Sequence, residues 1–597
     1  MTRRLLVTTA LEQTWGRDQP ILFAGEWCRL YDRQAAWGAR PHEVLAYHWS
    51  DRAKLLRDYN YLNDLQESLL AHIADALNAY HGIERPLRYW RMVLGVWLPT
   101  YVAVLFDRWE CLRLACSSGE ELETIALPDA AHEQAPRDCE AFIDAAAYSA
   151  EWNHRLFVRI IRRAHAERCA IRAADLPAAA SAAAGRAAAA GATTRRPLVR
   201  AILKQLLWKL DALAGALFRS YKVTFVSSYF PAGALLRLNL ALGQVPRLHA
   251  SEFADSGRAA AEPGSSGRAA NRSALRIARP AASDFEAFLT ARIGADLPCA
   301  YVEEFATQLE RVRAIGISTR VICSAGAHWS NELFKLWCAE EVLKGTKFVA
   351  LTHGGALPFV IDQTMRFEEK ISDKKVTWSI PYLPNHVRLP PSKLVGRRVS
   401  SSKLLCSVIT QETPLYPFRA SAGPIGVGVL EVVPLVCSLF AALRAEIQQH
   451  FRVKPYRNLG WRTRQRFGDA IGAERIYADE TYERCLAQSR VVVCTYPETT
   501  FAEAMASGLP TLLLYPAHLW EVIPQLQGLL ATLRAADIVY DDAQRAADHL
   551  NRIWADPDGW WSSRAVVAAR EQFFACCLDL DRRWLHRWTG FLRECAA

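Results

Sequence analysis

The chain has 597 residues, 51% hydrophobic and 22% charged, which is enough apolar material for several cores and excludes a largely disordered protein. Its net charge of +10 favours partners that carry phosphate, or an anionic membrane face. The arginines are scattered and no nucleic-acid-binding module is recognisable, so we expect no nucleic-acid partner. The 15 cysteines include no C-x-x-C pair, which argues against a zinc site and a disulfide framework.

Two apolar runs were considered as membrane segments. The run 93–106 is too short to cross a bilayer, and the run 424–443 contains a proline and a glutamate. The N-terminus turns polar too soon for a signal peptide. We therefore expect a cytoplasmic protein, at most peripheral at the inner membrane.

The first half of the chain mixes short strands with long amphipathic stretches. It predicts strands at Arg4–Ala10 and Lys222–Ser228, and helices within 60–82 and 138–168. Two low-complexity stretches interrupt this pattern, an Ala-rich one at 177–193 and a Ser/Gly-rich one at 254–273. The first is predicted to be an Ala-rich helix or a loose insert without a catalytic role, and the second a flexible excursion.

The second half alternates strands and helices more regularly. Strands are predicted at Thr319–Ser324, Lys347–Leu351, Leu404–Ile409, Arg452–Tyr456, Arg490–Cys494 and Thr511–Leu514. Helices are predicted at Ser330–Lys344 and Phe501–Ser507, and throughout 542–595. This alternation is typical of α/β proteins whose parallel sheets are covered on both faces.

One candidate site follows the strand that ends at Thr495, where a helix begins near Thr500. Free N–H groups at such a helix start can bind phosphate, and the hydroxyls of Thr499 and Thr500 could assist. The spacing of Thr500 and Glu503 is equally that of a capping box, a purely structural device. The sequence leaves both interpretations open.

Two further strand ends carry polar groups. His353-Gly354-Gly355 offers a titratable ring and a backbone that a ligand can approach closely, although a lone histidine is more often structural. Lys454 and Arg457 could neutralise a diphosphate, although short basic turns are usually just solvated. In a parallel sheet these strand ends converge on one crevice.

Several motifs together resemble a family of transferases encoded in bacterial O-antigen loci, and they extend over most of the chain. They are Gly25–Tyr31, Tyr47–Arg52, Arg88–Arg91, Phe334-Lys335, His353–Gly355, Ile371–Asp373, Thr377-Trp378, Gly460-Trp461, Thr495-Tyr496, Thr499-Thr500 and Trp560-Trp561. The layout is also distantly similar to capsule Kdo transferases and polyglycerol-phosphate transferases. The chain departs from the family pattern at Ala356–Pro358, Pro497-Glu498 and Ser379-Ile380.

The resemblance implies a GT-B-like fold, in which two Rossmann-like domains face a cleft. The implied division is an N-terminal acceptor domain (1–370), a donor-binding domain (371–540) and a C-terminal helical segment (541–597). It also implies a metal-independent reaction with no cofactor beyond the nucleotide-sugar substrate.

The strand-end reasoning and the resemblance together assign roles to residues. Donor contacts are expected from Gly354, Gly355, Lys454, Arg457, Thr495, Thr499, Thr500 and Glu503. The base that deprotonates the acceptor is expected to be His353, Glu26 or Asp51. Acceptor contacts are expected from Arg29, His48, Trp49, Arg52, Arg88 and Trp90, with burial of the tryptophans as the alternative.

The function that follows is transfer of a sugar from a nucleotide-activated donor to a lipid-linked or oligosaccharide acceptor of O-antigen or capsule synthesis. Two alternatives stay open because of the departures from the family pattern. One is a polyol-phosphate-type transferase with the same cleft. The other is a protein that binds nucleotide sugars or polysaccharide without turnover.

Overall fold

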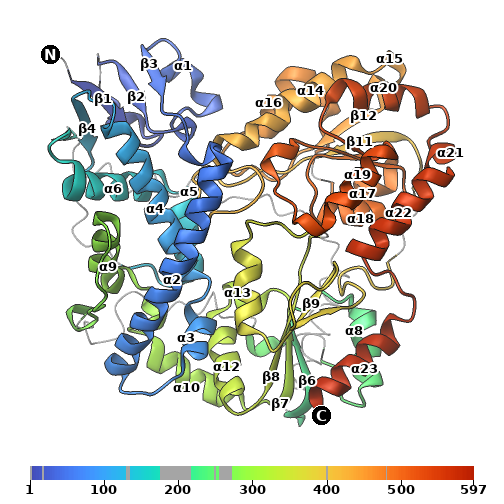
Figure 1. The fold of residues 1–597 in the computed structure, drawn as a ribbon, viewed down its shortest axis with the longest axis horizontal. Helices are drawn as coiled ribbons and strands as arrows, with labels where there is room; N and C mark the ends of the chain where they lie inside the picture. The colour runs from blue at the N-terminus through green and yellow to red at the C-terminus, as the bar shows by residue number, and fades with distance from the viewer. Residues whose placement is uncertain are drawn as a thin grey trace.

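The computed structural model describes residues 3–16, 19–128, 135–174, 217–247, 250–253, 272–355, 357–397, 401–478 and 480–597. These residues form three five-stranded parallel sheets, each with helices packed against it (Figure 1). We call them the first unit (within 3–174), the second unit (within 217–397, with the last helix) and the third unit (within 401–577). The Ala-rich insert 177–193, and 254–271 of the Ser/Gly-rich insert, lie outside the described residues.

The first unit contains a sheet of strand order β3-β2-β1-β4-β5. Its strands are β1 (Arg4–Val7), β2 (Ile21–Phe23), β3 (His42–Val44), β4 (Leu122–Ala126) and β5 (Cys169–Ala173). Only β1 corresponds to a strand predicted from the sequence. The segment expected to be one N-terminal domain therefore contains two separate sheets.

Five helices within the described part of the first unit pack around its sheet or connect it to the rest of the molecule. They are α2 (Arg52–His81), α3 (Leu87–Leu94), α4 (Trp97–Cys116), α5 (Cys139–Tyr148) and α6 (Ala150–Ile160). Figure 1 shows α2 running from the first unit down beside the second. In the described part of the chain no single helix is long and apolar enough to span a membrane, and α3 with α4 passes only as a pair bent by 63°.

The second unit has the strand order β10-β9-β8-β7-β6. Its strands are β6 (Ser220–Val226), β7 (Ser318–Ser324), β8 (Lys347–Leu351), β9 (Lys374–Thr377) and β10 (His386–Arg388). Its helices include α8 (Ala232–Ala241), α10 (Phe305–Ile315), α12 (Glu332–Leu343) and α13 (Gln363–Ile371). The expected boundary at residue 370 falls inside this sheet, which continues to Arg388.

The third unit has the strand order β12-β11-β13-β14-β15. Its strands are β11 (Leu405–Ile409), β12 (Phe451–Lys454), β13 (Ser489–Cys494), β14 (Thr511–Leu514) and β15 (Val539–Tyr540). Its helices include α14 (Val432–Ala442), α16 (Thr463–Ile471), α17 (Tyr482–Gln488), α18 (Thr499–Ser507), α19 (Gln527–Ala535), α20 (Ala543–Ile553), α21 (Pro557–Trp561) and α22 (Arg564–Cys577). Ile409 pairs in register with both Lys454 and Cys494, so these three strands end level with one another.

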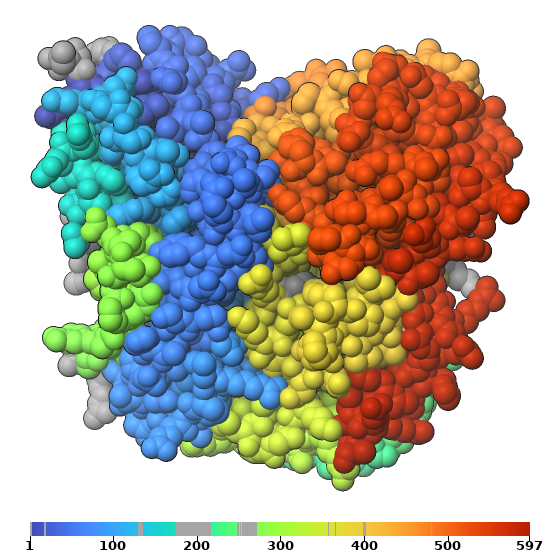
Figure 2. Space-filling view, viewed as in Figure 1, coloured from blue at the N-terminus to red at the C-terminus, as the bar shows by residue number. Residues whose placement is uncertain are grey.

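The last helix, α23 (Trp584–Ala596), leaves the third unit and packs on α8 and β7 of the second. The indole Nε1 of the buried Trp588 donates to the carbonyl of Pro390 at 2.9 Å. In Figure 2 the yellow surface of the second unit meets the orange-red third unit across the middle of the molecule. The predicted class is confirmed: α/β, with two Rossmann-like units that face each other in a GT-B-like layout and a helical C-terminal segment. The first unit is an addition to it.

Candidate active site

The second and third units meet where β8 and β13 end. The backbone N–H of Gly355 donates to the hydroxyl of Thr499, the first residue of α18, at 2.8 Å. A Cβ on Gly354 would lie 2.0 Å from the same hydroxyl oxygen, and Gly355 has a φ of +87°. Both glycines are therefore required, one for close approach and one for its backbone angle. In this conformation the partner that approaches them is Thr499.

The start of α18 is not the capping box that the spacing of Thr500 and Glu503 suggested. The N-cap residue is Glu498, no side chain caps the helix, and Thr500 already lies within it. The Thr500 hydroxyl bonds to the phenol of Tyr496, and Glu503 pairs with Lys393 at 2.6 Å. The capping-box interpretation of this motif was wrong, because the helix begins at Thr499, two residues earlier than the predicted start at Phe501.

His353 follows β8 by two residues, directly before the glycines that contact Thr499, and it is exposed. Its ring packs edge-on against Trp329 and Tyr229, with centroid separations of 6.4 and 6.5 Å. Desolvation by the surrounding protein lowers the pKa of His353, while the nearby Glu368 carboxylate opposes this shift. The imidazole is therefore neutral at neutral pH, which is the form that accepts a proton.

The buried carboxylate of Glu368 acts on this histidine through Trp329. Glu368 accepts hydrogen bonds from the Trp329 indole and from His328, each at 3.0 Å, and lies 3.1 Å from the Lys375 ammonium. Burial raises the pKa of Glu368, but Lys375 and His328 outweigh burial and bring it to about 2. The ionised carboxylate holds Trp329 in place against the His353 ring.

Glu498 is a further functional candidate, which in the sequence stands out only as a departure from the family pattern. Burial raises its pKa to about 7, with Asp362 adding to the shift and Arg419 opposing it. The Arg419 charge also acts on His353, so one arginine influences both groups. Two titratable side chains with pKa values shifted in opposite directions are typical of catalytic sites. An acid directly after a strand end was the available signal in the sequence.

The other residues predicted to bind the donor, Thr495, Lys454 and Arg457, do not contact His353 or Glu498 in any hydrogen bond or ion pair of the described chain. The hydroxyl of the buried Thr495 donates to the carbonyl of Ile409 at 3.2 Å and stabilises the third sheet, so it is closed to a donor. Lys454 ends the edge strand β12, which β11 separates from β13. Arg457 is exposed, and its charge acts on Asp144 of α5, so it faces the first unit.

Two of the candidate bases have structural roles. Asp51 is the N-cap of α2 and accepts from the backbone N–H of Lys54 at 3.0 Å. Glu26 pairs with Arg29 at 2.6 Å, and Arg29 in turn contacts His42 at 3.1 Å. These contacts hold both acids within the first unit. His353 is the candidate base that lies at the junction of the second and third units.

The predicted acceptor arginines join the units instead. The guanidinium of Arg52 binds both carboxylate oxygens of Glu521 at 2.6 Å and the carbonyl of Leu519 at 2.9 Å, which ties α2 to the third unit. Arg88 of α3 donates to the carbonyl of Ile371 at 2.8 Å, in the second unit. Both therefore fix the arrangement of the units.

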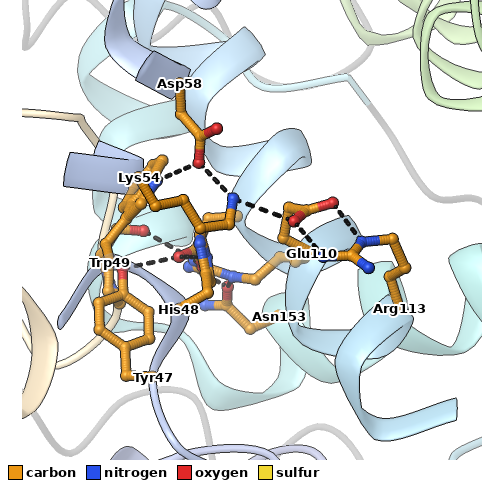
Figure 3. A network of polar contacts seen from close by, with 11 residues as sticks. Tyr47, His48, Trp49, Lys54, Asp58, Glu110, Arg113 and Asn153 are labelled. Carbon is orange, nitrogen blue, oxygen red and sulfur yellow. Dashed lines mark hydrogen bonds and ion pairs between the residues drawn. The ribbon is translucent and has the colours of Figure 1, made fainter. Parts of the chain in front are cut away.

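The aromatic residues that were predicted to contact the acceptor are buried. His48, Trp49 and Trp90 expose 5%, 1% and 0% of their surface. The Trp49 indole donates to Asp58 at 2.9 Å, as Figure 3 shows, and the Trp90 indole donates to Asn78 at 2.8 Å. The prediction of acceptor contacts was wrong for these three residues, because a sugar cannot reach their rings. The alternative, core packing, holds for both tryptophans.

His48 belongs to a buried ionic network in the first unit. Its Nε2 lies 3.1 Å from Asp107, which also accepts from the phenol of Tyr47 at 2.7 Å and pairs with Arg108. Arg108 is fully buried and donates to the carbonyl of Pro417 at 2.8 Å. The network therefore fixes the loop that carries Arg419, two residues further on.

This network includes a possible set of metal ligands. Among the described residues, His48, Asp107 and Cys111 are the group whose potential ligand atoms all lie within 4.8 Å of one another. Asp107 is already bound by Arg108 and Tyr47, and burial raises the pKa of the Cys111 thiol well above its ordinary value. A protonated thiol and an occupied carboxylate do not suit a metal ion. Metal independence of the reaction stays a prediction.

Comparison of the sequence with protein-family models identifies the family of this chain. Residues 4–592 match the family model described as LIC12162 family transferase. No curated protein matches the chain. Among solved structures, the chain is similar to MnaA of S. aureus in complex with UDP, with 11% identity over 49% of this chain and 80% of that one and a TM-score of 0.31. It is also similar to WaaG, a glycosyltransferase involved in lipopolysaccharide biosynthesis, with 11% identity over 49% of this chain and 95% of that one and a TM-score of 0.26. The match to the model extends over nearly the whole sequence, and the chain therefore belongs to the LIC12162 family of transferases.

Proposed function

We propose that this transferase is a glycosyltransferase, which moves a sugar from a nucleotide-activated donor to a lipid-linked or oligosaccharide acceptor of surface-polysaccharide synthesis. The observation that carries the proposal is the pair His353 and Glu498 at the junction of two Rossmann-like units. Membership in a transferase family supports it. The proposed location is the cytoplasmic side of the inner membrane, and the reaction uses no metal.

The proposed step breaks the bond between the anomeric carbon of the sugar and the donor phosphate. An acceptor hydroxyl attacks that carbon, its proton passes to neutral His353, and the nucleotide leaves as its phosphate anion with the bonding electrons. The positive charge of Arg419 favours the developing negative charge on the leaving group. Proton removal by a positioned base contributes about 10²–10⁴-fold to the rate of such reactions.

The donor enters this site only if the closed junction opens. The hydrogen bond between Gly355 and Thr499 occupies the start of α18, where the donor phosphate is proposed to bind. Opening would free the Thr499 hydroxyl and the N–H groups of Gly354 and Gly355 for the phosphate. The proposed reaction cycle therefore alternates between this contact and donor binding.

The test begins with a thermal-shift screen of UDP-, GDP-, dTDP- and CMP-sugars, followed by a transfer assay with each stabilising donor. A ligand present at about one hundred times its Kd stabilises by about 2.7 kcal/mol, which is readily detected. The His353→Gln variant should lose about 10²–10⁴-fold in rate while its melting temperature stays unchanged. The matched control is His72→Gln on α2, which should transfer like the wild type.

Other results would change the proposal. Transfer of a polyol phosphate in place of a sugar would identify the second type of transferase. Donor binding without any hydrolysis or transfer would show that the protein binds nucleotide sugars without turnover. Activity lost in EDTA and restored by Mg²⁺ or Mn²⁺ would overturn metal independence.

A further inference from the structure

A groove of about 540 Å³ opens beside the candidate active site, between α8, the segment Lys393–Arg397 and Trp584 of α23. Arg237, Lys393 and Arg397 contribute three cations to its wall, and no carboxylate lines it. Tyr229 and Trp584 add aromatic surface. A concave surface with several cations and aromatic walls suits an anionic ligand that also carries an apolar or planar group.

The three cations are not equally neutralised. Lys393 pairs with Glu503 at 2.6 Å and Arg397 pairs with Glu483 at 2.9 Å, and both acids belong to the third unit. Arg237 is exposed and stacks on the Trp584 ring, with its guanidinium carbon 5.4 Å from the ring centroid. Within the described part of the chain, no ion pair forms on Arg237. Its charge is therefore the surplus that a phosphate group would neutralise.

The wall between the groove and His353 is built from strained backbone. Ser227 and Tyr229, just after β6, have φ angles of +49° and +63°. Such conformations are uncommon in residues other than glycine and cluster at functional sites. A Cβ on Gly326 would lie 2.9 Å from the Tyr229 phenol oxygen, so this glycine leaves the room that the tyrosine occupies.

Tyr229 therefore contacts both the groove and the candidate base. It lines the groove, and its ring centroid lies 6.5 Å from that of His353. A ligand with its phosphates against Arg237 would therefore lie beside the same tyrosine that the candidate base contacts.

We propose that the groove binds the diphosphate of a substrate, held by Arg237 with Lys393 and Arg397. The identity of the ligand as a substrate rests on the proposed function, whereas the binding of diphosphate does not. Two sources share this chemistry, the nucleoside diphosphate of the donor and the polyprenyl diphosphate of a lipid-linked acceptor.

The test is calorimetric titration of the full chain with inorganic pyrophosphate, UDP, GDP and farnesyl diphosphate. Replacing the surplus cation in Arg237→Ala should raise the Kd of the bound probe by about tenfold or more, and Arg237→Lys should recover part of the loss. The Kd should also rise as salt increases from about 50 mM to about 300 mM. The control is Arg311→Ala on α10, an exposed arginine on a helix that Figure 1 shows on the other side of the second unit from α8.

The probes separate the two sources. Binding of UDP or GDP that depends on Arg237 assigns the groove to the donor and moves the donor phosphates away from the start of α18. Binding of farnesyl diphosphate with the same dependence assigns the groove to the acceptor and leaves the donor at α18. A wild-type protein that binds none of the probes overturns the proposal, as does an unchanged Kd in Arg237→Ala at an unchanged melting temperature. If Arg237→Ala weakens binding but no donor is turned over, the proposed function fails and the groove assignment stands.

Discussion

The backbone N–H of Gly355 and the hydroxyl of Thr499 join the second sheet to the third at a distance of 2.8 Å. This bond is possible because Gly354 has no side chain, since a Cβ there would lie 2.0 Å from the same oxygen. A ligand that entered between β8 and α18 would have to separate these two residues. The contact is therefore both a structural link and the expected point of opening.

The first prediction concerns Gly354→Ala. The added methyl should force Thr499 to rotate and break its hydrogen bond, which lowers the free energy of unfolding by about 1 kcal/mol. Transfer activity should fall as well, because the methyl occupies the phosphate approach. Urea unfolding and the transfer assay provide the two readouts.

The matched control for this variant is Gly528→Ala in α19, where an added Cβ meets nothing within 4 Å. Alanine in that exposed helical position should stabilise the protein by about 0.5–1 kcal/mol. A Gly354→Ala protein with wild-type stability and activity would contradict the close packing described above.

The second prediction concerns Thr499 and Thr500 as ligands of the donor phosphate. The double alanine variant should lose donor affinity by more than its change in stability explains, and replacement of both by serine should preserve binding. Most of the stability loss should come from Thr500→Ala, because this change leaves the buried phenol of Tyr496 without its hydrogen-bond partner. An unpaired buried hydroxyl lowers the free energy of unfolding by about 1–3 kcal/mol. Calorimetric donor Kd and melting temperature are measured on each variant. An unchanged Kd in the double alanine variant would move the phosphate site toward the groove at Arg237.

The third prediction follows from the pKa of Glu498, which burial raises to about 7. Between its ordinary pKa and about 7 the folded protein holds a proton on this carboxyl that the unfolded chain has released. Stability contributed by this group is therefore present at acidic pH and lost as the pH rises through about 7. Glu498→Gln should flatten the decline in melting temperature between about pH 5 and pH 8. Parallel curves for the two proteins would show that Glu498 titrates at its ordinary pKa.

Much of the second half of the fold could be predicted from the sequence. The strand at Lys347–Leu351 is found with the predicted bounds, and the strand that ends at Cys494 begins one residue earlier, because each is a buried apolar run between polar turns. The first sheet could not be predicted in the same way. Its strands β2 and β3 have three residues each, too few to show any periodicity.

The candidate site could be predicted only in part. His353, Gly354 and Gly355 follow a strong strand signal, and the structure brings them to Thr499 as strand-end reasoning implies. The raised pKa of Glu498 could not be predicted, because it arises from burial in the folded protein and from Asp362, which is distant in the sequence. Polar and aromatic residues such as His48 and Trp90 were interpreted as a binding surface, although they form buried hydrogen bonds. Residue type does not distinguish these two environments.

The last prediction concerns Arg108, which is fully buried and ion-paired with Asp107. Arg108→Met should destabilise the protein by about 3–5 kcal/mol, because it leaves the Asp107 charge buried without its partner. The double variant Asp107→Asn/Arg108→Met removes both charges and should recover a large part of that loss. Urea unfolding of the wild type and the two variants measures both effects.

The double variant also separates stability from function. Arg108 holds the carbonyl of Pro417 at 2.8 Å, and Arg419 follows on the same loop. If this contact positions Arg419, the double variant should fold but show a lower kcat with a smaller change in KM, since the charge of Arg419 acts on the leaving group. Wild-type kcat in the stable double variant would show that the loop is held by other contacts. A double variant as unstable as Arg108→Met alone would show that the guanidinium acts through its hydrogen bonds to the backbone and to Asn153, at 2.8 Å, more than through its charge.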